Sequence, residues 1–125
     1  MAEGMKQLGA ALAALPEVRE LMMNIDAGTS PVAVSGLASV HRAQLAAALR
    51  QQLDRPLLVL CADENEANRM ALDLTALLGE EVSLLFAREW QLRDRVSASH
   101  GWEQQRIGTL CRLAAGEASV LVATV

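Results

Sequence analysis

The sequence contains very little lysine and few aromatic residues. Lys6 is the single lysine among 125 residues, tyrosine is absent, and aromatic residues make up 2% of the chain. Basic residues number 11 and acidic residues 15, so the net charge is −4. Proteins that bind nucleic acid use lysine and arginine to neutralise phosphates, and aromatic rings to stack on unpaired bases. We therefore do not expect this chain to bind DNA on its own.

Cysteine and histidine are also scarce. Cys61 and Cys111 lie far apart in the sequence, and so do His41 and His100. A zinc site needs three or four such ligands, usually in closely spaced pairs. We expect two reduced thiols that pack as small apolar side chains, with no bound metal and no cofactor.

Long apolar runs are missing as well. Hydrophobic residues make up 52% of the chain and charged residues 21%, which is typical of a folded domain. There is no run of about 18 uncharged apolar residues that could span a membrane. The N-terminus lacks the basic stretch and long apolar core of a signal peptide. We expect a cytoplasmic protein with no membrane partner, and the length fits one domain.

The order of the apolar runs predicts alternating strands and helices. Residues 1–27 have the spacing of a helical segment, with Pro16 in the first turn of its second helix. Residues 28–125 are expected to form an α/β subdomain. Its helices are expected at 40–53, 64–78 and 102–115, and its buried strands at Val32–Ser35, Leu57–Ala62, Val82–Phe86 and Val120–Val125.

This alternation predicts a parallel sheet of about four strands, with right-handed crossovers and helices on both faces. Asp63 and Glu66 have the spacing of a capping box at the start of the second helix of the subdomain. In its third helix, we expect Ile107 and Leu110 to face the core. Because the chain stops on a strand at Val125, with no helix to cover it, we expect a fragment of a longer protein.

The turn after the first expected strand occupies the place of a phosphate loop. Such a loop has the pattern G-x-x-x-x-G-K-[ST], whose glycines let backbone N–H groups surround the phosphates while the lysine reaches their oxygens. This turn contains Ser35, Gly36, Ser39 and Arg42, so a single glycine is present and the lysine is missing. The bulky guanidinium of Arg42 does not replace a lysine in a tight loop. We expect a degenerate site that does not hydrolyse nucleotide, with at most weak attraction of an anion to the helix N-terminus.

Two further turns follow expected strands, where parallel sheets usually bind their ligands. The carboxylates of residues 63–66 favour helix capping over catalysis, because no histidine or lysine accompanies them as a base. The stretch after the third strand contains arginine and tryptophan, which are enriched in interface hot spots. We predict a candidate interaction surface there, with a solvated loop as the alternative; its residues are Arg88, Glu89, Trp90 and Arg93.

Five short groups of residues occur in a fixed order along the chain. They are Val32–Leu37, Leu57–Leu60 followed by Asp63–Ala67, Ala87–Glu89, Arg106–Ile107 with Leu110 and Leu113, and Val122–Val125. As an ordered set they resemble the N-terminal segment of the bacterial transcription-repair coupling factor (Mfd) family. The resemblance extends from about Leu12 to Val125. Phe86 departs from it, because the family usually has proline before Ala-Arg-Glu.

The resemblance implies the first α/β subdomain of a UvrB-like module, similar in fold to P-loop NTPases and helicase motors but with a degenerate nucleotide site. Full-length proteins of this family are ATP-dependent DNA translocases that release stalled RNA polymerase and recruit UvrA. Their motor, their polymerase-binding region and most of their UvrA-binding surface lie outside the matching segment. The expected role is therefore a non-catalytic scaffold whose direct partners are adjacent domains of the same polypeptide, with DNA reached only through the motor.

Two other functions stay open on the residues alone. The first alternative is the nucleotide- or DNA-binding half of a helicase-type motor, which would hold a phosphate at Gly36. The remaining alternative is a fragment of a small-molecule α/β enzyme, which would have a closed pocket with converging polar groups at the strand ends.

Overall fold

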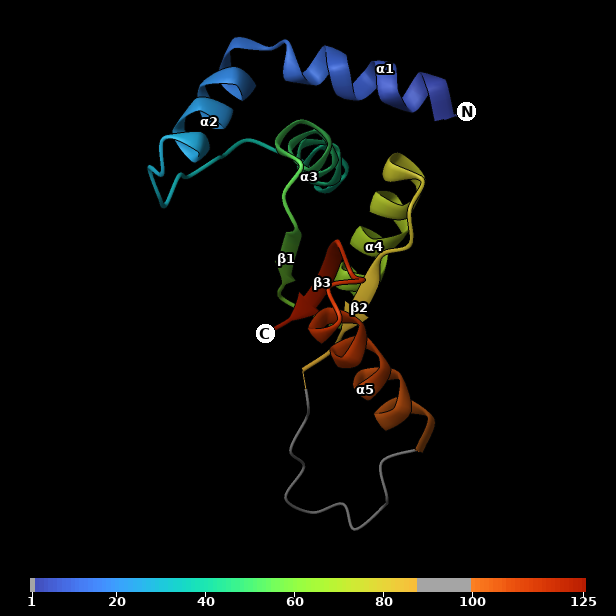
Figure 1. The fold of residues 1–125 in the computed structure, drawn as a ribbon. Helices are drawn as coiled ribbons and strands as arrows, with labels where there is room; N and C mark the ends of the chain where they lie inside the picture. Colours follow the sequence, from blue (N-terminus) through green and yellow to red (C-terminus); the bar gives the residue numbers. More distant parts are fainter. Residues whose placement is uncertain (1, 88–99) are drawn as a thin grey trace. The chain divides into compact units, whose positions relative to one another are not determined.

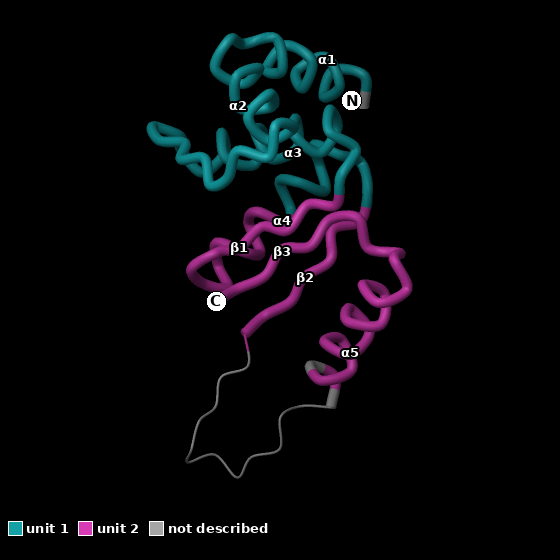
Figure 2. Tube along the Cα trace, turned by 60° about the vertical axis from the view of Figure 1, so that its left-hand side comes forward, with its two compact units in different colours: residues 1–55, 72–80 teal, residues 56–71, 81–125 magenta. Residues whose placement is uncertain are grey.

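The fold was analysed in a computed structural model that describes residues 2–87 and 100–125. The chain divides into two compact units, which Figure 2 shows in different colours. We call residues 1–55 and 72–80 the helical unit, and residues 56–71 and 81–125 the sheet unit. The division at residues 27 and 28 stays a prediction about domain organisation. None of the described helices is long and apolar enough to cross a membrane.

The helical unit contains α1 (Ala2–Ala13), α2 (Pro16–Asp26), α3 (Ser39–Leu53) and the second half of α4 (Glu64–Leu78). Pro16 begins α2, as predicted, because the first turn of a helix needs no N–H from that residue.

Helices α1 and α3 pack closely through small residues (Figure 1). Ala43, Ala47 and Ala48 of α3 are buried, and Gly9 of α1 is buried too. A Cβ atom at Gly9 would lie 2.5 Å from the side-chain oxygen of Gln51, so any larger residue there would displace that side chain.

The sheet unit contains three parallel strands, β1 (Leu57–Cys61), β2 (Ser83–Leu85) and β3 (Val120–Thr124), together with α5 (His100–Ala114). The strand order is β1-β3-β2, so β3 is central (Figure 1). Val122 of β3 pairs with Val59 on one side and Leu84 on the other, and its exposed fraction is 0%. The predicted α/β class with a parallel sheet is confirmed.

The two crossover connections of this sheet run in opposite directions. The chain passes from β1 through α4 across to β2, and then from β2 through α5 back to the central β3. Because parallel crossovers are almost always right-handed, opposite directions assign α4 and α5 to opposite faces of the sheet. Along α4, Ala67, Met70, Ala71 and Leu74 form a buried stripe with helical spacing.

The prediction of a strand at Val32–Ser35 is wrong in this structure, which has three strands among its described residues rather than about four. The segment is extended but has no strand beside it, and the side chain of Val34 is 50% exposed. An apolar run becomes a strand only when a neighbouring strand pairs with its backbone. The apolar run alone therefore did not determine whether Val32–Ser35 forms a strand.

The predicted inward face of α5 is wrong as well. Ile107 is 60% exposed and Leu110 is 44% exposed, whereas Thr109 is buried. The hydroxyl of Thr109 donates a hydrogen bond of 3.3 Å to the carbonyl of Leu84, and the Arg106 guanidinium donates to the carbonyl of Phe86. Both bonds connect α5 through polar side chains to β2 or the residue after it, while Ile107 and Leu110 remain exposed.

Candidate functional site

The turn that the sequence analysis compared with a phosphate loop lies at the start of α3. Gly36 has a φ of +80°, a left-handed conformation that glycine adopts without the strain of a side chain. Ala38, not Ser39, is the N-cap residue, with an extended backbone and no side-chain capping bond. Ser39 is already the first helical residue, so its hydroxyl does not cap the helix.

The charges around this turn do not match those of a phosphate site. Ser35, Gly36, Ser39 and Arg42 do follow one another through the turn into the first turn of α3, as predicted. The backbone N–H of Arg42 donates to the Ala38 carbonyl at 3.0 Å, within the regular helix pattern. The single lysine of the sequence lies on α1, so no ammonium group belongs to the turn or its helix.

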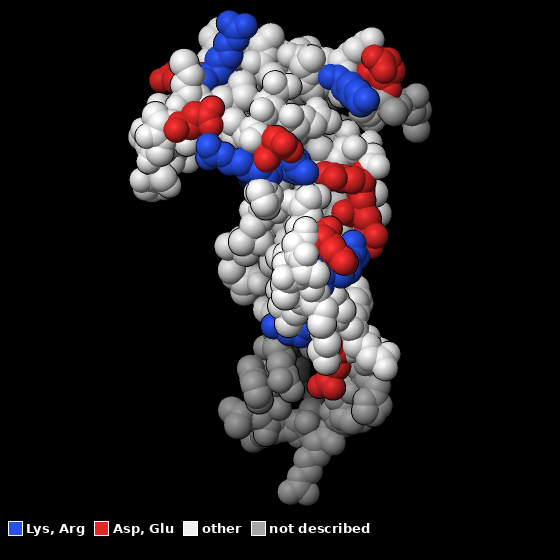
Figure 3. Space-filling model, viewed as in Figure 1, with Lys and Arg blue, Asp and Glu red and all other residues white. Residues whose placement is uncertain are grey.

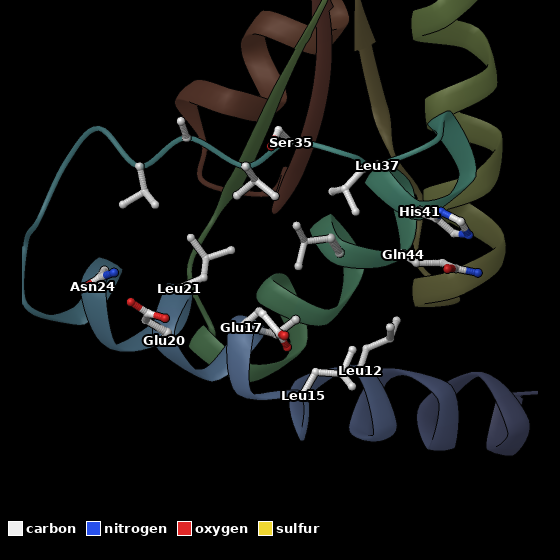
Figure 4. Close-up of a pocket in the computed structure, with 15 residues that line it drawn as sticks. Leu12, Leu15, Glu17, Glu20, Leu21, Asn24, Ser35, Leu37, His41 and Gln44 are labelled. Carbon is white, nitrogen blue, oxygen red and sulfur yellow. The ribbon is translucent and has the colours of Figure 1, made fainter.

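An apolar groove of about 610 Å³ adjoins the same turn in the helical unit. Its walls come from the end of α1, from α2, from the extended segment 32–37 and from the beginning of α3. Figure 4 shows Leu21 of α2 and Leu37 pointing into the space between these elements. Ser35 lines the groove, whereas Gly36, Ser39 and Arg42 do not.

Sequence reasoning missed this groove. The helical spacing of Leu12, Val18 and Leu21 indicated an apolar face, and such a face ordinarily packs in a core. In the structure these side chains line an open groove instead. The pattern showed that the face was apolar, but not which element would cover it.

The second predicted turn, after β1, is a helix cap. The N–H of Glu66 donates to the Asp63 carboxylate at 2.8 Å, and the Glu66 carboxylate accepts from the N–H of Ala62 at 3.1 Å. This is a variant of the capping box, in which the Glu66 carboxylate accepts from the N–H one residue before the N-cap Asp63. Since both carboxylates hold the start of α4, they are used for structure.

Cys61 ends β1 beside this cap and is buried. Burial raises the pKa of its thiol, and the negative charges of Glu66 and Asp63 raise it further. A protonated thiol is a poor nucleophile and a poor metal ligand. Within residues 2–87 and 100–125, no three histidine, cysteine or acidic side chains are grouped to hold a metal ion.

Hydrogen bonds join the ends of the three strands at the carboxyl edge of the sheet. The N–H of Ala87 donates to the hydroxyl of Thr124 at 2.7 Å, and the N–H of Val125 donates to the carbonyl of Cys61 at 3.3 Å. These bonds tie the ends of the three strands together.

The predicted interaction surface of Arg88, Glu89, Trp90 and Arg93 lies outside the described residues. On the face of the molecule seen in Figure 3, blue basic and red acidic atoms lie next to one another over the part that is coloured. Three arginines of the described part are paired with carboxylates: Arg50 with Asp54, Arg55 with Asp26, and Arg112 with Glu81. Mixed and paired charges of this kind do not form a basic surface for a phosphate backbone.

Comparison of the chain with protein-family models, with curated proteins and with solved structures found no match.

Proposed function

We propose that this chain is a non-catalytic scaffold subdomain of a transcription-coupled DNA repair factor of the Mfd type. In this proposal it is the first α/β subdomain of a UvrB-like module, with a helicase-type, P-loop-like fold whose nucleotide site is degenerate. It works in the cytoplasm and supports adjacent domains of the same polypeptide. The parent protein translocates on DNA with its own motor, releases stalled RNA polymerase and recruits UvrA through regions beyond this chain.

The observation that carries the proposal is the chemistry of the turn before α3. Triphosphate binding needs several backbone N–H groups pointing at one anion and a cation that reaches its terminal oxygens. This turn has one glycine, an alanine N-cap and no ammonium group. In this proposal, a helicase-type subdomain without a working nucleotide site is suited to structural support.

A second support is the arrangement of the segments that resemble the family. Leu57–Leu60 and Val122–Val125 belong to neighbouring parallel strands or their ends, and Asp63–Ala67 opens the helix after the first of them. These are the places where an α/β motor fold presents its strands and turns. The α/β class and the parallel sheet are consistent with the proposal, although many unrelated proteins share them.

Titration calorimetry with ATP and Mg²⁺ tests the absence of a nucleotide site. We expect no binding heat with the 125-residue chain at ligand concentrations up to about 1 mM, the upper end of ordinary substrate affinities. An intact P-loop ATPase serves as the positive control. Micromolar binding that Arg42→Ala abolishes would overturn the proposal and favour a motor half-domain.

A strand-specific repair assay tests the role in transcription-coupled repair. In cells that encode the full-length protein, Leu74→Asp places a charge at a residue whose exposed fraction is 0% and unfolds its surroundings. We expect loss of the preferential repair of the transcribed strand. Glu3→Gln, at an exposed position of α1, is the matched control. Unchanged strand preference in cells that carry unfolded Leu74→Asp protein would contradict the proposed function.

A further inference from the structure

The groove of the helical unit has the size and lining of a binding site. Its volume of about 610 Å³ falls within the range of ligand sites, about 300–1,000 Å³. Most of its lining is aliphatic, and it includes Leu12, Val18, Leu21, Val34 and Leu45. An apolar hollow of this size is stabilised when apolar side chains displace its water.

One wall of the groove is a stretch of backbone without hydrogen-bond partners. In the described part of the chain, no backbone hydrogen bond joins Val32–Ser35 to another segment. Figures 1 and 4 show the segment as an extended trace, and its residues are exposed. An extended backbone with free hydrogen-bonding groups is a template for an added β-strand.

The opposite wall carries negative charge. Glu17 and Glu20 lie one helical turn apart on α2, and both line the groove. No lysine or arginine is among the described residues of the lining. Glu17 also lies in the first turn of α2, where a carboxylate favours the helix dipole, but this role does not account for Glu20.

We propose that this groove binds an extended segment of a partner protein in which apolar residues alternate with lysine or arginine. The segment pairs with the backbone of Val32–Ser35 as an added strand. Its apolar side chains fill the groove, and its basic side chains face Glu17 and Glu20. A second copy of this chain is a poorer occupant, because the chain has a net charge of −4 and a single lysine. This inference does not depend on the proposed role in DNA repair.

A fluorescein-labelled peptide of alternating valine and lysine is the probe for this site. We expect saturable binding to the 125-residue chain, measured by fluorescence anisotropy at low ionic strength. Glu17→Gln with Glu20→Gln should weaken binding about three- to tenfold, as expected for two partly exposed ion pairs. Glu3→Gln, which removes a carboxylate outside the groove, should leave the affinity unchanged.

Three further measurements separate the parts of the proposal. Val34→Asp places a charge on the groove wall at a half-exposed position, so the chain should fold, as checked by circular dichroism, and lose the peptide. A peptide that is N-methylated at every second residue should bind at least tenfold more weakly if its backbone pairs as a strand. A peptide with glutamate in place of lysine should not bind.

The proposal is overturned if the valine–lysine peptide fails to bind, or if Val34→Asp binds it unchanged. Equal binding of the N-methylated peptide would eliminate the added strand. Tighter binding of an amphipathic leucine–lysine helix would show that the groove takes a helix instead. Dimerisation of the chain that Val34→Asp abolishes, observed by analytical ultracentrifugation, would identify a second copy as the occupant.

Discussion

The same substitution at two valines tests how the structure divides its apolar runs between core and surface. Val122 lies in the central strand with an exposed fraction of 0%, whereas Val34 lies in an unpaired segment and is 50% exposed. Valine to alanine removes two carbon groups, each worth about 0.8 kcal/mol when fully buried. The transfer loss is therefore about 1.6 kcal/mol at Val122 and about half of that at Val34.

A cavity adds to the cost at Val122, because strands on both sides hold its surroundings in place. Core substitutions that leave cavities cost more than the transfer free energy alone, so we expect a total of about 2–3 kcal/mol for Val122→Ala. At Val34 solvent fills the space, and the total should stay below about 1 kcal/mol.

Urea unfolding, followed by circular dichroism and by tryptophan fluorescence, measures both variants. With a urea dependence of about 2 kcal/mol/M, Val122→Ala should lower the midpoint by about 1 M or more, and Val34→Ala by less than about 0.5 M. If two transitions appear, each is fitted alone. Equal midpoint shifts for the two variants would refute the reasoning, since they would place Val34 in a paired, buried strand.

Four other predictions concern the sheet unit. Asp63→Ala should cost about 1 kcal/mol in thermal or urea unfolding because the N–H of Glu66 loses its acceptor, while Asp63→Asn should cost less; equal costs would argue against the capping box. Ser83→Ala should leave stability unchanged or raise it, because the buried Ser83 hydroxyl has no hydrogen-bond partner among the described residues, and a clear loss in the same unfolding assay would reveal a partner for it. A thiol reagent such as dithionitrobenzoate should label the exposed Cys111 at once and the buried Cys61 only as the chain opens, so equal labelling rates would contradict the packing of β1. The folded-state pKa of Cys61 is raised above its ordinary value of 9.0, so the unfolded chain loses the thiol proton at a lower pH than the folded chain does. The free energy of unfolding should therefore keep the full contribution of this group below pH 9 and fall above it, and less so in Cys61→Ala.

Local signals in the sequence were sufficient for several of the helix ends. Pro16 begins α2, the spacing of Asp63 and Glu66 forms the capping box of α4, and Gly79 and Gly116 follow their helices with positive φ. Each of these features depends on residues within a few positions of one another. Tertiary context does not have to be known to predict them.

The candidate site was predictable only in part. The missing lysine and the single glycine of the turn before α3 are sequence facts, and the structure adds the backbone conformation of Gly36 and Ala38. The adjoining groove needs residues from α1, α2, the extended segment and α3 at once. No local sequence pattern predicts that these elements leave a space between them.

The sequence by itself determined the α/β class, the helices and three paired strands in their order, and the lack of a lysine in the turn before α3. It did so because apolar periodicity, capping residues and the presence of a lysine are local properties of the chain. The tertiary structure alone decided that β3 is the central strand, that Val32–Ser35 is left unpaired, and that α5 contacts β2 through Thr109 rather than Ile107. Those outcomes depend on which distant segments supply hydrogen-bond partners and cover apolar surface, and that is settled only when the whole chain packs.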